Sequence, residues 1–360
     1  MLASFRSQPI YLRGRGDEGR DTRRRQRFPS SRPIPRGGSA LSGTLLANAA
    51  IPAFARHETF HPRFGWLRKA VTESAKAGNV FTDPEATVKL GVGKNMVTAI
   101  RYWGLAFKIL EQEDNPGRPR RPHVVPSAFG RALLGDTGWD PYLEEAGSLW
   151  LLHWKLLSPT CQAPVWWVAF NDFTALQFTE SQLTAHVLEL AAAAGWPKVV
   201  EASVKKDVDC MLRTYTVRRQ GRQGLDDVLD CPFRELGLIQ AAAGDEGRTW
   251  RFVVGEKPGL PDEIITYAAM DFAARSSEGA RSISIARLAH DPGSPGAAFR
   301  LTETGLFDAL SRAAVSVDSL QVAEPGGLRQ LLFTGDPASI AEEILTRYYG
   351  CWAKKGEKSA

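Results

Sequence analysis

Cysteine is scarce in this sequence, and long apolar runs are missing from it. The 360 residues include four cysteines, which are widely spaced and form no Cys-x-x-Cys pair, so neither a zinc ribbon nor a disulfide framework is indicated. We expect reduced, buried thiols in a cytoplasmic protein. No run of about 18 uncharged, strongly apolar residues occurs, which excludes a membrane-spanning helix and predicts that the partners include no membrane. The cysteines are Cys161, Cys210, Cys231 and Cys351.

The sequence also lacks a recognisable catalytic or metal-ligating motif. Its six histidines are scattered, with no His-Glu-x-x-His pattern and no Cys/His cluster. Acidic residues gather in two places, and they form either a solvated helix face and a turn or the ligands of a divalent ion. The pattern identifies neither catalytic residues nor metal ligands. The two acidic groups are Asp207 with Asp209, and Asp226 with Asp227 and Asp230.

Positive charge is unevenly distributed along the chain, whose formal net charge is +5. Residues 1–40 carry ten Arg and three acids (+7), and residues 57–135 carry twelve basic and seven acidic side chains (+5). Arg56 adds one charge, which leaves −8 for residues 136–360. We therefore predict a disordered basic tail over residues 1–56 and a basic module over residues 57–135. The tail is a solvated extension or, alternatively, a phosphate-binding arm or a twin-arginine signal.

The acidic remainder divides into a Trp-rich helical middle module over residues 136–260, a C-terminal helical, winged-helix-like module over 261–350 and a tail over 351–360. Five tryptophans between Trp139 and Trp167 form a packed core or, alternatively, a stacking platform for single-stranded nucleic acid. We favour the core because little positive charge is interleaved with these rings. The segment LLHWKLL has helical periodicity, and VWWVAFN predicts a buried strand.

The segment LGVGKNMVTAI predicts a helix-turn-helix within the 57–135 module. Leu90, Val92, Val97 and Ile100 have the spacing that packs two such helices together, with Gly91 at the turn. A phosphate loop does not fit, because that motif needs G-x-x-x-x-G-K-[ST] after a strand. The alternative is a helical pair with a purely structural role. In the favoured interpretation four side chains of the second helix face DNA in the major groove. These are Lys94, Asn95, Thr98 and Arg101.

Two further basic groups are candidate DNA contacts. Behind the second helix, a Pro/Gly-rich turn leads into a short strand, as in the wing of a winged helix, although a merely solvated loop remains the alternative. Two lysines near a predicted helix with a Ser203 cap indicate a second helix-turn-helix-like unit, after a helix capped by Thr179. The wing residues are Arg118, Arg120 and Arg121, and the two lysines are Lys205 and Lys206.

The predicted fold class is mainly α with small β-hairpins (α+β), built from tandem winged-helix or helix-turn-helix-like modules. A weak internal echo supports the repetition: AFRLTETGLFDAL resembles HVVPSAFGRALL in its strand residue, its Ser or Thr, its Gly and its apolar helix. Chance similarity between two strand-to-helix junctions is the alternative.

Five blocks in a fixed order resemble a bacterial family known as domain of unknown function 4007, over about residues 57–350. They are FHPRFGWLRKA, LGVGKNMVTAIRYW, LLHWKLLS, SVKKDVDC and DPGSPGAAFRLTE. Members of that family typically occur beside a cysteine desulfurase and a phosphoadenosine-phosphosulfate-reductase-like protein in DNA phosphorothioation and phage-defence operons. The resemblance implies the DNA nickase subunit of an Ssp-type system, which opens one strand so that sulfur can replace a non-bridging phosphate oxygen.

Two hypotheses follow for the function. In the first, the protein is a nickase that uses Mg²⁺ or Mn²⁺, docks double-stranded DNA through residues 57–135 and works with the cysteine desulfurase and the sulfur-transfer/ATPase proteins of the modification complex. In the second, it is a non-catalytic adaptor or a regulator that binds DNA and recruits those proteins. The DNA contact is argued from residues, whereas the nickase activity is implied by the resemblance alone.

Overall fold

The structure, a computed structural model, describes residues 37–115, 122–216, 231–242, 249–276 and 279–359. Gly37–Ala360 forms one compact unit. Within the described residues this unit is mixed α/β, mainly helical, with small antiparallel sheets. One hydrophobic core contains buried residues from the first described helix to the last. The predicted α+β class is therefore confirmed at that level.

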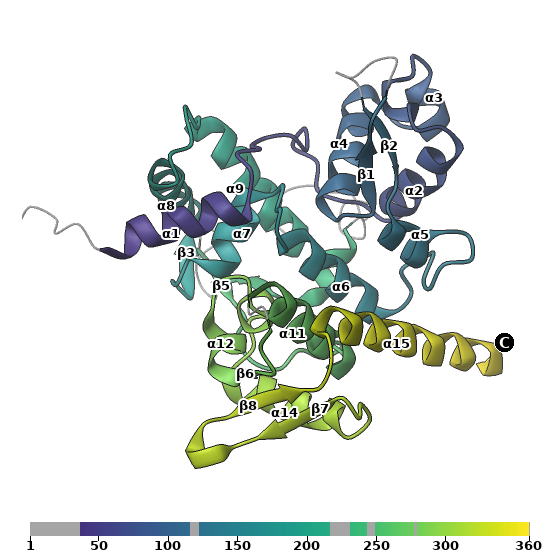
Figure 1. Cartoon of the computed structure of the whole chain (residues 1–360). Helices are drawn as coiled ribbons and strands as arrows, with labels where there is room; N and C mark the ends of the chain where they lie inside the picture. The colour runs from purple at the N-terminus through teal and green to yellow at the C-terminus, as the bar shows by residue number, and fades with distance from the viewer. Residues whose placement is uncertain (1–36, 116–121, 217–230, 243–248, 277–278, 360) are drawn as a thin grey trace, which may run out of the picture. The chain divides into compact units, whose positions relative to one another are not determined.

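The first part of the chain has three helices followed by a β-hairpin (Figure 1). Gly91 adopts φ +60 between the second and third helices, a left-handed conformation that glycine tolerates best. A small apolar cluster of Ala86, Leu90 and Val97 packs these two helices together. The elements are α2 (Trp66–Lys76), η1 (Val80–Thr82), α3 (Ala86–Leu90), α4 (Lys94–Ala106), β1 (Leu110–Glu113), β2 (His123–Pro126) and α5 (Ala128–Leu134).

The middle of the chain contains a three-stranded sheet with the order β3–β5–β4, and every neighbouring pair is antiparallel. The helix after β3 begins with a capping box, in which Thr179 accepts from Gln182 N and Gln182 accepts from Thr179 N. The elements are α6 (Ala146–Leu157), α7 (Pro164–Asn171), β3 (Gln177–Thr179), α8 (Glu180–Ala193), α9 (Glu201–Tyr215), η2 (Pro232–Leu236), β4 (Ile239–Ala241) and β5 (Thr249–Phe252).

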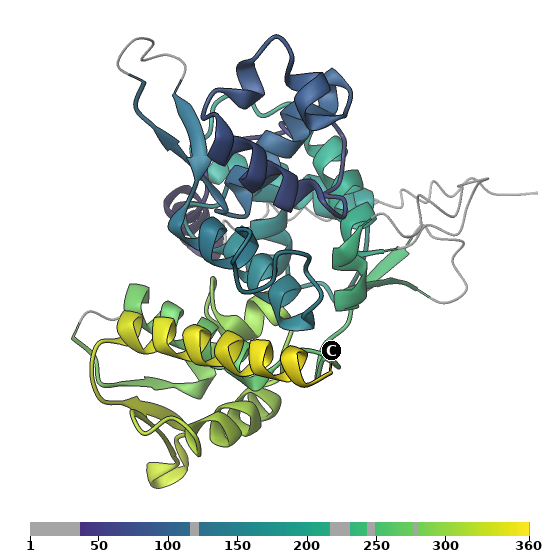
Figure 2. The ribbon, with the colours of Figure 1, turned by 90° about the vertical axis from the view of Figure 1, so that its right-hand side faces the viewer.

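The C-terminal part repeats this arrangement with the sheet order β6–β8–β7. In both parts a helix, a strand, further helices and a hairpin follow one another, and the last strand lies in the centre of the sheet. Helix α15 packs along α11 (Figure 2). The elements are α11 (Asp262–Ser276), β6 (Ser282–Ser284), α12 (Ile285–His290), α13 (Pro295–Phe299), α14 (Glu303–Ala314), β7 (Leu320–Ala323), η3 (Pro325–Gly327), β8 (Gln330–Phe333) and α15 (Pro337–Ser359).

Three local predictions are wrong. The segment VWWVAFN is helix α7 and not a strand, because Pro164 occupies its first turn and the helix is buried all round, which hides its periodicity. Ser203 lies inside α9, whose N-cap is Val200. Helix α2 begins only at Trp66, so Phe64 lies outside it and is 45% exposed.

The predicted disordered tail over residues 1–56 is wrong from Gly37 onward. Helix α1 (Gly37–Ala49) packs on α8, and Leu46 is fully buried. Ala50 forms a parallel bridge with Cys161. At the other end, α15 runs through Ser359, so the predicted tail over 351–360 is helical as far as that residue. The module boundaries at 135 and 260 stay predictions.

The tryptophans form a core, as predicted. Trp150, Trp154, Trp166 and Trp167 are at most 2% exposed, so they are not available for stacking on bases. Cys161, Cys210 and Cys231 are free thiols in the interior, whereas Cys351 is exposed, contrary to the expectation of four buried thiols. Among the described residues, no helix is both long enough and apolar enough to cross a membrane.

Candidate nucleic-acid interface

Helices α3 and α4 form the predicted helix-turn-helix. Leu90 and Ile100 are fully buried and Val97 is 5% exposed, so the residues predicted to hold the pair together do lie at their contact. Lys69 of α2 donates its Nζ to the carbonyl of Leu90 at 2.7 Å, which caps the last turn of α3. The start of α4 is thereby held in one orientation relative to α2 and α3.

The side chains predicted to face DNA lie on the outer surface of α4. Lys94, Asn95 and Thr98 are exposed, and Arg101 is half-buried. Burial lowers the pKa of Arg101 from its usual value, but a guanidinium stays protonated at neutral pH. Lys94 and Asn95 make no hydrogen bond or ion pair with any residue that the structure describes, so their polar atoms are available to a ligand.

The N-terminus of α4 adds backbone donors to these side chains. The residue before the helix is Gly93, which has no side chain to cap the first N–H groups. A helix N-terminus carries a partial positive charge and binds phosphate well. Lys94 and the first turn of α4 together present a cationic, donor-rich surface.

The other predicted DNA contacts fare differently. Lys205 and Lys206 are both exposed on α9, as expected for a basic edge. Lys205 is paired with Glu201 at 2.6 Å, so part of its charge is neutralised within its own helix. Strands β1 and β2 form the antiparallel hairpin expected of a wing (Figures 1 and 2). The three wing arginines, Arg118, Arg120 and Arg121, lie outside the described residues.

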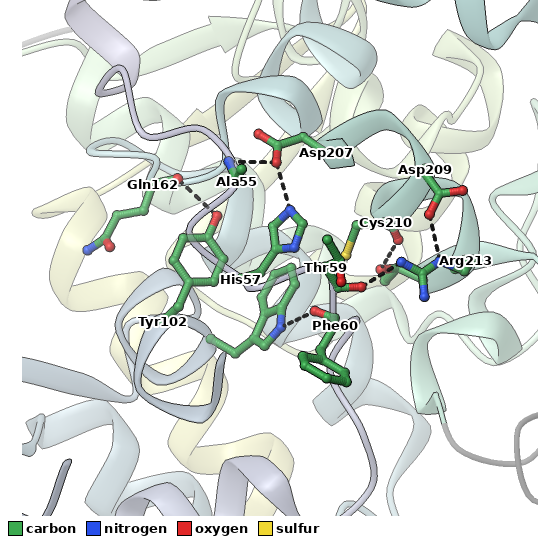
Figure 3. A network of polar contacts seen from close by, with 12 residues as sticks. Ala55, His57, Thr59, Phe60, Tyr102, Gln162, Asp207, Asp209, Cys210 and Arg213 are labelled. Carbon is green, nitrogen blue, oxygen red and sulfur yellow. Dashed lines mark hydrogen bonds and ion pairs between the residues drawn. The ribbon is translucent and has the colours of Figure 1, made fainter. Parts of the chain in front are cut away.

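Asp207, one of the candidate metal-binding acids, is buried and not on a solvated helix face. It is 2% exposed and accepts hydrogen bonds from His57 Nε2 at 2.7 Å and from Ala55 N at 2.8 Å (Figure 3). Burial raises the pKa of its carboxyl, and the hydrogen bond from His57 lowers it. Asp207 shares the buried face of α9 with Val204 and Met211, three and four residues away, and that spacing could have revealed its burial.

The remaining candidate acids give no metal site either. Asp209 pairs with Arg213 at 2.9 Å (Figure 3), and Asp226, Asp227 and Asp230 fall outside the described residues. No group of three or more His, Cys, Asp or Glu side chains able to hold an ion occurs within the part of the chain that the structure describes.

Sequence reasoning missed a cationic cluster that forms only in the folded chain. Three arginines from separate elements act electrostatically on one buried histidine, His61. Because about 150 residues separate the first arginine from the second in the sequence, no local pattern could have revealed the cluster. Its arginines are Arg63, Arg213 and Arg234.

Comparison with protein families gives one match, to the family described as "Protein of unknown function (DUF4007)", over residues 54–349. The chain belongs to the DUF4007 family. This DUF4007 chain is also similar to two solved structures, a magnesium-ion-bound SspB crystal structure with a TM-score of 0.81 and an SspB crystal structure with a TM-score of 0.80. In each case the identity is 44%, over 85% of this chain and 90% of that chain. No curated protein matches the sequence.

Proposed function

We propose that this DUF4007 protein is the DNA-binding component of an Ssp-type DNA phosphorothioation system and nicks one strand of double-stranded DNA. Its similarity to SspB at 44% identity over most of both chains supports the place in such a system. The exposed, donor-rich start of α4 in a helix-turn-helix is the observation that carries the DNA contact. The proposed partners are the cysteine desulfurase and the sulfur-transfer/ATPase proteins of the modification complex.

We interpret the three parts of the fold as tandem winged-helix-like modules. In the first, α3 and α4 are followed by the β1–β2 hairpin, as a helix-turn-helix is followed by its wing. The middle and C-terminal parts add a strand before the helix pair, and their sheets share one strand order. This repetition supports the interpretation of the chain as three related units.

Each exposed residue of α4 has a chemically suited DNA group. Lys94 reaches a backbone phosphate together with the N–H groups of the first turn. Asn95 is suited to a bidentate pair with adenine, and Thr98 to a thymine methyl or a base-edge acceptor. Arg101, one turn further on and half-buried, is suited to a phosphate at the groove edge. Lys205 and Lys206 provide a second phosphate contact.

Nicking of DNA commonly uses carboxylates that hold Mg²⁺ or Mn²⁺, and one of the similar SspB structures is a magnesium-bound form. The described residues of this chain do not fit such a site, because Asp207 is buried against His57 and Asp209 is paired with Arg213. We therefore assign the proposed metal requirement to no particular residue and derive no step through the ion.

Fluorescence anisotropy with a labelled duplex tests the DNA contact. The K94A/N95A variant should bind about ten- to a hundredfold more weakly than the wild type, because a base contact and a phosphate contact are lost. The slope of log K against log salt should become shallower by about 0.9. K76A is the matched control, since Lys76 is an exposed lysine at the end of α2. Equal affinities for K94A/N95A and K76A would show that α4 does not contact DNA.

Plasmid relaxation tests the nicking activity. Supercoiled plasmid should give open circles, without linear product, when the protein is supplied with Mg²⁺ or Mn²⁺ but not with EDTA. If the protein shifts the plasmid in a salt-sensitive way and leaves it supercoiled, both alone and with the partner proteins, then it is an adaptor and the nicking proposal is wrong.

A further inference from the structure

His61 is a buried histidine whose ring has no polar partner in the protein. It is 7% exposed, and neither Nδ1 nor Nε2 has a hydrogen-bond partner among the described residues. A buried imidazole usually satisfies at least one nitrogen, and each unmade hydrogen bond is costly. Burial, followed by the positive charge of Arg213, lowers the pKa of His61 to about 3. The ring is therefore neutral, with one N–H donor and one acceptor nitrogen.

Three guanidinium groups surround this ring from different elements. The segment before α2 supplies Arg63, α9 supplies Arg213 and η2 supplies Arg234, and each of the three lowers the pKa of His61. Like charges that converge in this way repel one another, so the arrangement favours a bound anion. We call this group the His61 cluster: His61, Arg63, Arg213 and Arg234.

The arginines of the cluster are positioned by contacts that leave donors available. Arg213 directs Nε to Asp209 at 2.9 Å and Nη2 to the carbonyl of Thr59 at 2.5 Å (Figure 3). Its Nη1 has no acceptor among the described residues, and its side chain is 26% exposed. Arg234 donates Nε to the carbonyl of Arg213 at 3.1 Å. The guanidinium of Arg63 lies 5.4 Å from the centre of the Trp66 ring.

The charge and geometry of the cluster suit a tetrahedral oxyanion. Asp209 balances one of the three guanidinium charges through its pair with Arg213. Guanidinium groups have five N–H donors each and match the oxygens of a phosphate with paired hydrogen bonds. The N–H of a neutral His61 adds a donor that would otherwise stay unsatisfied.

We propose that the His61 cluster binds a phosphate group. Under the proposed function, on which this choice of source rests, the phosphate is a backbone phosphodiester of the DNA strand. Free inorganic phosphate has the same chemistry and is the other source. The cluster is formed by α9, η2 and the segment before α2, so it is a second phosphate contact, built from residues other than those of α4.

NMR of the full-length protein with ¹⁵N-labelled histidine tests the site directly. We expect the ring resonances of His61 to shift saturably when a DNA duplex is added, while those of the exposed His290 shift little. A shift with inorganic phosphate alone as well would identify the free ion as a ligand of the same site. No His61 shift with either probe, in a protein that still binds DNA through Lys94, would overturn the inference and leave the proposed function standing. Conversely, a shift with phosphate in a protein that does not bind DNA would retain the site and refute the DNA role.

Two charge-removing variants provide the second arm of the test. R213Q and R234Q should each weaken duplex binding about tenfold, because each removes a charge-assisted hydrogen bond to phosphate. R287Q is the matched control, since Arg287 pairs with Asp291 at i,i+4 on α12 just as Arg213 pairs with Asp209 on α9. Far-UV circular dichroism shows whether each variant is folded. Folded R213Q and R234Q proteins that bind as tightly as R287Q would contradict the proposal.

Discussion

Acidification should destabilise this protein through His153, which is buried where α6, α9 and α13 meet. His153 Nε2 donates to the carbonyl of Ala298 at 2.9 Å, so Nδ1 is the acceptor for the Tyr215 hydroxyl at 2.8 Å. Burial is the main cause that lowers the pKa of His153 from 6.5 to about 4. The unfolded chain therefore binds a proton at a higher pH than the folded chain does.

The size of this effect follows from the difference between the two pKa values. Stability contributed by the neutral ring is complete above pH 6.5 and is lost as the pH falls toward 4. The loss is about 2 kcal/mol at pH 5 and about 3.4 kcal/mol once the pH is below both values. His61, with a folded pKa of about 3, should add a similar loss at pH 5.

Urea unfolding of the wild type and of H153Q at pH 7 and pH 5 measures the contribution of His153. Glutamine can keep an amide N–H near Ala298, so H153Q should fold. Its unfolding free energy should fall by about 2 kcal/mol less than that of the wild type between the two pH values. H290Q, which changes an exposed histidine, should follow the wild type. The same pH dependence in H153Q and the wild type would refute the reasoning.

Two further predictions concern the packing around the proposed interface. G130A should lower the free energy of unfolding by about 2–3 kcal/mol, because its Cβ would lie 1.9 Å from the carbonyl oxygen of Ile109. G305A at the equivalent place behind Thr302 should be neutral or slightly stabilising in the same urea titration, as nothing lies closer than 3.3 Å. D207N should reduce the melting temperature and leave duplex affinity unchanged by anisotropy. An unaltered melting temperature would show that the bond from His57 contributes nothing to stability.

Local sequence patterns predicted the elements whose determinants are close together in the chain. The helix-turn-helix was predicted because Gly91 and the apolar residues around it lie within eleven positions, and the structure confirms each. The echo between HVVPSAFG and AFRLTETG is confirmed in part. Ser127 and Thr302 each cap a helix and accept from the N–H of Gly130 and Gly305 respectively. However, only Ser127 follows a strand.

The features that the sequence concealed depend on contacts between distant residues. Asp207 belonged to an acidic run, but its burial depends on His57, 150 positions away. Helix α1 carries few strongly apolar side chains, and it folds because α8 covers it. Strand β6 has only three residues, so its pairing with β8 gives no periodicity that a sequence window could detect.

The three repeated parts of the fold differ in charge at the helix that precedes each hairpin. Helix α4 begins with the exposed Lys94 and Asn95, whereas α14 begins with Glu303 and also exposes Asp308. The basic Arg312 of α14 is already held by Asp262 through two hydrogen bonds, at 2.7 and 2.8 Å. Phosphate would be repelled at the start of α14 and attracted at the start of α4. The DNA contact that we propose therefore follows from the side chains of the first part and not from the shared topology.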